Sequence, residues 1–88
     1  MSTYQFKGVL SAESQEEFRQ MIEAAKSGSS VRLDFSKVDR INSMGIALLL
    51  KALKELKQGG KSVEIAGANE MIQVSFKMMG INSWATLV

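Results

Sequence analysis

Apolar and polar residues follow two different periods in the first part of the chain. Residues 4–10 alternate apolar and polar side chains as far as Gly8, as a β-strand with one buried face does. Residues 11–14 then offer capping side chains, and the Ser-Gly-Ser-Ser run at residues 27–30 ends the next segment. Between these limits the apolar residues recur with a period near 3.6. This pattern predicts a helix whose apolar stripe consists of Phe18, Met21, Ile22 and Ala25.

The central part of the chain repeats this order of strand and helix. Residues 31–35 alternate and predict a second strand, and residues 36–40 predict a polar connection. From Ile41 the period changes to about 3.6, which predicts a helix capped by Asn42 or Ser43 and ended by Gly59 and Gly60. We expect its apolar stripe to lie against the sheet. The stripe consists of Ile46, Leu49, Leu50, Leu53 and Leu56.

The last part of the chain adds one more strand and one more helix. Residues 62–66 predict a short strand, and Asn69 and Gly80 bound a helix that carries Met71, Ile72, Val74, Ser75, Met78 and Met79. We expect residues 81–88 to pack back onto the domain as a final strand. The alternation of strands and helices predicts a single α/β domain over residues 1–88. Its mostly parallel sheet would have four or five strands, with helices mainly on one face.

The residue types exclude most kinds of catalytic chemistry. The 88 residues include no cysteine and no histidine, which excludes disulfides, thiol catalysis, the usual zinc sites and the commonest general base. Gly-x-Gly-x-x-Gly, phosphate-loop and Gly-x-Ser-x-Gly motifs are all missing. Asp34 and Asp39 are carboxylates that a metal could use, but lone carboxylates seldom bind one without partners. We therefore predict no enzyme activity, no cofactor and no metal site.

Charge and hydropathy limit the kinds of partner. The net charge is only +2, with eleven basic residues scattered among nine acidic ones, whereas a nucleic-acid-binding domain would cluster its basic residues on one face. We predict no nucleic-acid binding. The longest apolar run, residues 44–50, is far shorter than the roughly 20 residues that span a bilayer. We therefore expect a cytoplasmic protein without direct membrane insertion.

Residues 34–50 carry the most specific signal in the chain. They read Asp-Phe-Ser, a short loop, Ile41, and then Asn-Ser-Met-Gly-Ile at the start of a helix. This order resembles the central signature of the STAS family, which includes bacterial anti-sigma factor antagonists. Weaker matches in the family's order extend the resemblance over most of the chain: Gly8-Val9-Leu10 before the first helix, Gly59-Gly60-Lys61 with residues 63–67, and Met79-Gly80-Ile81 after the third helix.

The resemblance implies a regulatory protein–protein interaction domain that is switched by phosphorylation. It makes Ser43 the acceptor for a partner serine kinase that is also an anti-sigma factor, with ATP a substrate of the kinase alone. A phosphate suits a helix N-terminus because unpaired N–H groups and the positive end of the helix dipole lie there. The partner-binding residues that the resemblance implies are Ser11, Asp39, Asn42, Ser43, Met44 and Gly45. Among them, Gly45 would leave the surface beside Ser43 open to a partner backbone.

Two positions depart from the family pattern. The family has an aspartate before the acceptor, where Asn42 stands, and often another after the Gly-x-Leu turn, where Ser11 stands. Asn42 can still cap a helix, so the fold is unaffected. Contacts that those carboxylates would make to a kinase are lost.

Other interpretations stay open at the level of sequence. Ser43 could be a plain helix cap, and Met44 could fill the core. Stand-alone STAS subunits also dock on the ATPase of phospholipid-transport ABC complexes, and residues 45–50 resemble that branch as closely. A small-ligand sensor is a third option, which no residue favours. Only one strand fits before Ser11, where many family members have two, so an open sheet edge could pair two copies in a weak homodimer.

Overall fold

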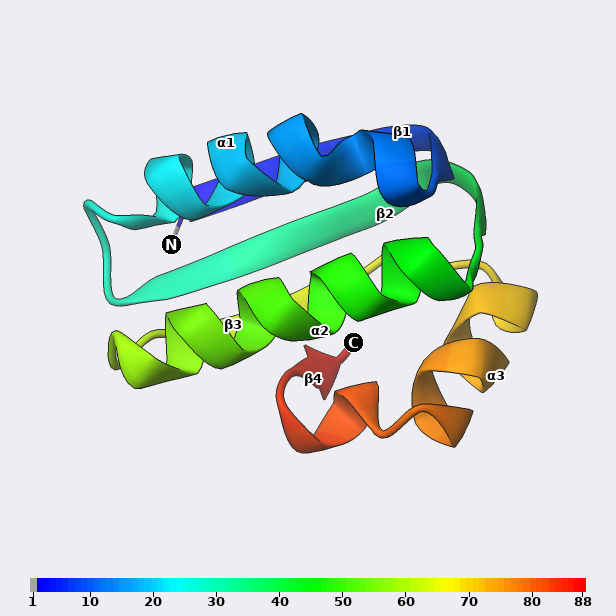
Figure 1. Ribbon diagram of the computed structural model, residues 1–88. Coiled ribbons are helices and arrows are strands. Elements are labelled where there is room, and N and C mark those ends of the chain that lie inside the picture. The colour runs from blue at the N-terminus through cyan, green and yellow to red at the C-terminus, as the bar shows by residue number, and fades with distance from the viewer. Residues whose placement is uncertain (1) are drawn as a thin grey trace.

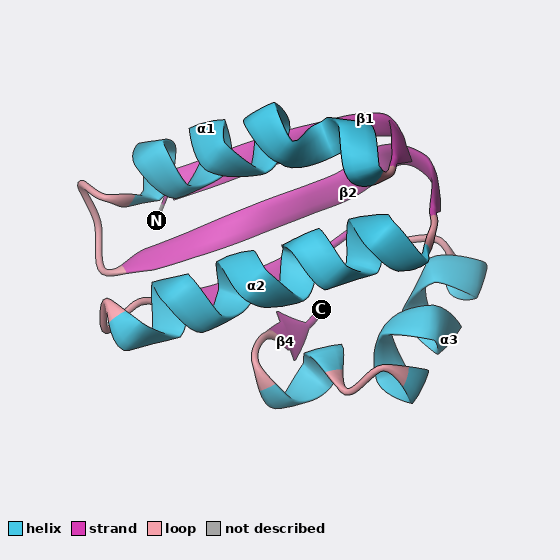
Figure 2. Ribbon diagram, in the orientation of Figure 1, coloured by secondary structure: helices cyan, strands magenta, loops and turns pink. Residues whose placement is uncertain are grey.

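Four parallel strands form the sheet of the protein in a computed structural model, which describes residues 2–88. The strands are β1 (Ser2–Leu10), β2 (Ser30–Ile41), β3 (Ser62–Ala66) and β4 (Thr86–Leu87), and they lie in that order across the sheet. The helices are α1 (Gln15–Ala25), α2 (Ser43–Gln58) and α3 (Glu70–Met78), with short 3-10 helices at Ala12–Ser14 and Ile81–Ser83. The predicted α/β class and the four-stranded alternative are confirmed (Figures 1 and 2).

Helices α1 and α2 lie side by side over one face of the sheet, and α3 lies beyond the start of α2, in agreement with the prediction of helices mainly on one face (Figure 1). Alternate strand residues are therefore buried beneath them, among them Phe6, Leu33 and Ile65. The opposite face is polar, and its side chains pair across strands. Arg32 and Glu64 form an ion pair at 2.9 Å there. This face needs no covering layer because its side chains are solvated or paired.

Strand β2 is longer than the sequence predicts. Instead of ending at Phe35 and continuing as a polar connection, it runs to Ile41 and stays paired with β1. Two register shifts, between Gln5 and Lys7 and between Gly8 and Val9, place extra residues in β2. These irregularities disturb the alternation of side chains, which is why residues 36–40 look like a loop in the sequence.

The core lies between the sheet and helices α1 and α2. Leu49 and Leu53 are 0% exposed, in agreement with the predicted stripe of α2. Phe6 contacts both Phe18 of α1 and Phe35 of β2, with ring centroids 5.0 and 5.2 Å apart. These aromatic contacts join the strand and helix layers at the centre of the domain.

Helix α3 is anchored by only two of its residues. Only Ile72 and Phe76 of this helix are buried, and Phe76 meets Phe35 edge to face. The methionines that the sequence pattern assigned to the helix are outside the core, with Met71 74% and Met78 80% exposed. Phe76 supplies the missing anchor because it lies one turn beyond Ile72 on the same face.

The C-terminal segment returns to the sheet as expected. After the 3-10 helix at Ile81–Ser83, β4 pairs with β3. Trp84 packs beneath the end of α2, where the ammonium groups of Lys54 and Lys57 lie 5.5 and 5.2 Å from its ring. No helix in residues 2–88 has the length and apolar content that crossing a membrane requires.

Candidate partner-binding site at the start of helix α2

Asn42 holds the N-terminus of α2 in place. Its side-chain oxygen accepts a hydrogen bond from the backbone N–H of Gly45 at 2.9 Å, so Asn42 is the N-cap. The backbone N–H of Asn42 donates to the carbonyl of Leu10 at 3.1 Å. Of the two caps that the sequence allows, the structure selects Asn42.

Ser43 is the first residue of α2, and its side chain is exposed. Its hydroxyl makes no hydrogen bond to any residue in 2–88, because Asn42 already caps the helix. The first two N–H groups of the helix, those of Ser43 and Met44, likewise have no acceptor within residues 2–88. An exposed hydroxyl therefore lies beside two free backbone donors at the positive end of a 16-residue helix.

The sequence suggested that Gly45 leaves the surface beside Ser43 open to a partner, but the structure shows otherwise. It is buried, and a Cβ at this position would lie 2.5 Å from the carbonyl oxygen of Leu10. The same Cβ would lie 2.9 Å from Cγ1 of Ile41. Gly45 is thus required by the close approach of α2 to the end of β1 within the chain itself.

Ser11 lies at the end of β1 beside this helix terminus. Its hydroxyl accepts from the N–H of Glu13 at 3.3 Å, and its own N–H donates to the hydroxyl of Ser14 at 3.0 Å. This reciprocal capping box starts the turn that leads into α1. Because Leu10 and Ile41 are opposite one another in the sheet, Ser11 and Asn42 follow adjacent strand ends.

Asp39 and Met44 complete the set of residues that the sequence singles out, and both side chains are exposed. Met44 is 55% exposed, so it is not core filler. The carbonyl of Asp39 accepts from the side chain of Asn69 at 3.4 Å, and Asn69 caps α3. The start of α3 therefore lies beside the start of α2 (Figure 1).

The exposed face of α3 is the feature that the sequence analysis missed. Met71, Val74 and Met78 recur at intervals of three and four, so they lie on one face of the helix. Their exposed fractions are 74%, 54% and 80%. These exposed apolar side chains make the outer face of α3 a candidate binding surface. The sequence did carry a signal for this surface, because flexible methionines suit adaptable interfaces. The four methionines concerned are Met44, Met71, Met78 and Met79.

The carboxylates of the described residues do not form a metal site. No group of three or more acidic side chains with suitable geometry lies within residues 2–88. Asp34 instead accepts from the backbone N–H of Ser36 at 2.9 Å and from the side chain of Gln5 at 3.0 Å. These hydrogen bonds, led by the one from the Ser36 backbone, hold the pKa of Asp34 below its usual value. Asp34 thus takes part in structural hydrogen bonds to its neighbours.

A family model described as "Mlab, STAS domain" matches residues 4–88. The chain belongs to the STAS family. No curated protein matches the sequence of this STAS domain. The resemblance that residues 34–50 indicate is therefore confirmed by a match that covers nearly the whole chain.

Several solved structures share the fold of this chain. A sulfate transporter family protein from Wolinella succinogenes superimposes with a TM-score of 0.81 at 11% identity, over 97% of this chain and 75% of that one. The STAS domain of a Vibrio cholerae SulP transporter gives 0.78 at 19% identity, over 97% and 71%. The anti-sigma factor antagonist SpoIIAA in its unphosphorylated form gives 0.72 at 16% identity, over 98% and 76%. At these identities the likeness establishes the fold.

Proposed function

We propose that this STAS domain is a phosphorylation-switched binding protein of the anti-sigma factor antagonist type. A partner serine kinase, itself an anti-sigma factor, would bind it when Ser43 is unmodified and release it once Ser43 carries phosphate. The domain would act in the cytoplasm, where ATP is available to the kinase, and would have no catalytic activity of its own. One observation carries the proposal: Asn42 caps helix α2, so the hydroxyl of Ser43 is not needed as a cap and is exposed.

The local geometry supports a phosphate at this position. A phosphate on Ser43 would lie next to the free N–H groups of Ser43 and Met44, which suit an anion. Because the fold tolerates the charge, modification would alter the surface without unfolding the domain. The charge change of nearly two units would then act on the partner, which has to desolvate that surface.

The surroundings of Ser43 provide the rest of a docking surface. Met44 is exposed beside Ser43, and the apolar face of α3 begins next to the same corner through the Asn69–Asp39 contact. Apolar side chains supply binding energy, and the serine supplies a site at which that binding can be cancelled. We therefore assign Met44, Met71 and Met78 to the partner surface together with Ser43.

The proposal is tested by identifying the partner and the modified residue. The domain should be used to capture the serine kinase encoded in its gene neighbourhood, and the purified pair incubated with ATP. Mass spectrometry should place one phosphate on Ser43 and none on Ser11 or Ser36, since Ser11 is held in a capping box. Phosphate on another serine, or none at all, would contradict the proposal.

A second candidate is a constitutive docking subunit on the ATPase of a phospholipid-transport ABC complex. Two observations favour it: the matching family model carries the Mlab description, and Asn42 replaces the carboxylate of the antagonists. Both candidates use the same corner of the domain, but only the switch needs the Ser43 hydroxyl. Capture of a transporter ATPase whose binding is equal for Ser43→Ala and Ser43→Asp would establish this second function.

A further inference from the structure

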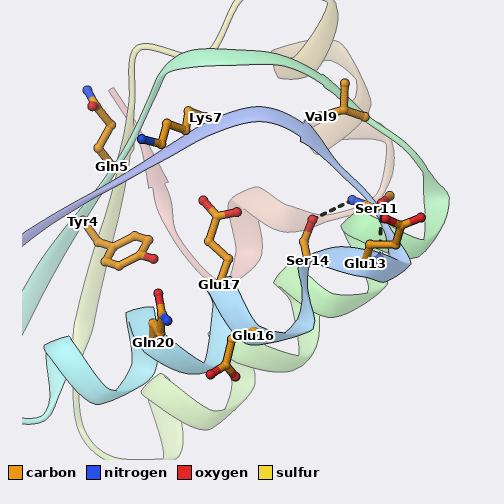
Figure 3. Close-up of a pocket in the computed structure, with 10 residues that line it drawn as sticks. All are labelled: Tyr4, Gln5, Lys7, Val9, Ser11, Glu13, Ser14, Glu16, Glu17 and Gln20. Carbon is orange, nitrogen blue, oxygen red and sulfur yellow. Dashed lines mark hydrogen bonds between the residues drawn. The ribbon is translucent and has the colours of Figure 1, made fainter.

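A groove runs along the outer edge of the sheet, on the side away from α2. It has a volume of about 830 Å³ and lies between β1 and the first half of α1 (Figure 3). Tyr4, Gln5 and Lys7 of β1 line it. Tyr4 points to the helix-covered side of the strand and Gln5 to the open side, so the groove follows the edge of β1 and not one of its faces.

This edge is free of any strand in residues 2–88. Strand β1 is nine residues long and pairs only with β2, so its other side presents unpaired backbone donors and acceptors. An extended segment of another polypeptide could add to it as a fifth strand and satisfy these groups. The backbone alone, however, does not specify which segment would bind.

The charge of the groove specifies the chemistry of the segment. Three glutamates, Glu13, Glu16 and Glu17, line the α1 side, and Lys7 is the one basic residue of the lining, which gives a formal charge of −2. The whole chain has a net charge of +2, so this negative region stands out.

Two of the glutamates are available to a ligand. Arg19 binds Glu16, but Glu13 and Glu17 form no ion pair within residues 2–88. Glu17 is half-buried and points towards β1 in Figure 3. Burial, together with the charge of Glu17, raises the pKa of Tyr4. Glu13 and Glu17 thus offer free negative charge along the path of an added strand.

We infer that the β1 edge is a second docking site, which binds an extended segment of a partner polypeptide rich in lysine or arginine. The segment pairs with the backbone of β1, and its basic side chains lie against Glu13 and Glu17. Ser11 borders both this groove and the Ser43 surface, but the glutamates and the β1 edge lie away from Ser43, so the site does not depend on the proposed switch.

A second copy of this chain fits the groove less well. Two copies joined through β1 would bring two negative grooves together, and β1 itself carries only Lys7 as a positive charge. Charge therefore favours a basic partner segment over the homodimer that an open edge suggests.

The test uses a nine-residue peptide of alternating valine and lysine, matched to the length of β1, and NMR spectra of the full chain. The amide signals of residues 2–10 and 13–20 should shift during the titration, and those of α3 should not. Changing Glu13→Gln and Glu17→Gln together should weaken binding by about 2- to 30-fold, the range that two partly exposed ion pairs supply. The matched control Glu55→Gln with Glu70→Gln removes the same charge outside the groove and should leave the affinity unchanged.

Two further peptides separate strand addition from simple charge attraction. A peptide of the same sequence with every backbone nitrogen methylated cannot donate hydrogen bonds to β1 and should not bind. A valine–glutamate peptide should not bind either. Equal binding of either peptide, shifts centred outside the groove, or self-association of the free protein through β1 would overturn the inference. Ser43→Asp should leave the lysine peptide's affinity unchanged, so failure of the switch and failure of this site give different results.

Discussion

The backbone N–H of Asn42 donates to the carbonyl of Leu10 across 3.1 Å, which ties the start of α2 to the end of β1. The same carbonyl oxygen leaves no room for a side chain at Gly45, in the first turn of the helix. The position of Ser43, between these two residues, is therefore fixed by the fold. A serine at such a fixed position would present the same surface at each binding event, as the proposed switch requires.

Gly45→Ala should destabilise the domain by about 1–3 kcal/mol, the usual cost of overpacking, because the new methyl would meet the Leu10 backbone. Urea unfolding followed by circular dichroism measures the change. Gly59→Ala is the matched control, since a Cβ there lies 3.5 Å from its nearest neighbour and the backbone has an ordinary φ of −81°. Equal stability of the two variants would show that α2 does not approach β1 so closely.

Leu53→Ala should reduce the free energy of unfolding by about 2–5 kcal/mol, because Leu53 is fully buried between α2 and the sheet. Met78→Ala removes a similar apolar side chain from a site that is 80% exposed and should change stability by less than about 0.5 kcal/mol. Thermal and urea unfolding of both variants checks the contrast. A large loss of stability for Met78→Ala would mean that the outer face of α3 is covered.

Asp34→Asn should weaken the domain at every pH above about 4 and should lose this effect in acid. The folded-state pKa of Asp34 is lowered by hydrogen bonds from Ser36 and Gln5, so its stabilising effect is present above the unfolded value of about 3.9. It is lost as the pH falls through the lower folded-state pKa. The side chain is largely solvated, so we expect a difference below about 1 kcal/mol at pH 7. Urea unfolding should show that this difference disappears near pH 2; a constant difference would contradict the assignment.

The purified domain should hydrolyse neither ATP nor phosphoester substrates, since it has no histidine, no cysteine and no phosphate-binding glycine loop. Phosphate release measured at micromolar protein checks this. Neither the wild-type protein nor the Ser43→Ala variant should show turnover. Activity that survives repurification and is lost in Ser43→Ala would make Ser43 a nucleophile instead of an acceptor.

The sequence predicts the layers of the fold because the apolar residues of its strands and of α2 follow regular periods. Val31, Leu33 and Leu49 all lie where their spacing indicates. The second half of β2 could not be predicted as a strand, because the irregular register beside Gly8 breaks the alternation of side chains that marks one. The buried face of helix α3 could not be predicted for another reason. Its apolar residues cover most of the helix surface, so the pattern does not tell the buried Phe76 from the exposed Met78.

The candidate site could be located from the sequence but not built from it. The motif places Ser43 at a helix start, yet the choice between Asn42 and Ser43 as the cap depends on side-chain geometry. The burial of Gly45 depends on the Leu10 backbone, which is 35 residues away in the chain and adjacent only in the fold. The groove beside β1 also requires the three-dimensional arrangement, because its glutamates lie on the 3-10 helix Ala12–Ser14 and on α1 and not on β1 itself.

The affinity of the captured kinase for Ser43→Ala and Ser43→Asp, measured side by side by calorimetry, tests the central claim most directly. Both variants should stay folded, because an acid at a helix N-terminus is neutral or stabilising. Ser43→Ala should bind like the unmodified protein. Ser43→Asp should bind at least about tenfold more weakly, a difference of about 1.4 kcal/mol, since its carboxylate reproduces part of the phosphate charge. Equal affinity of the two variants would contradict the phosphorylation switch.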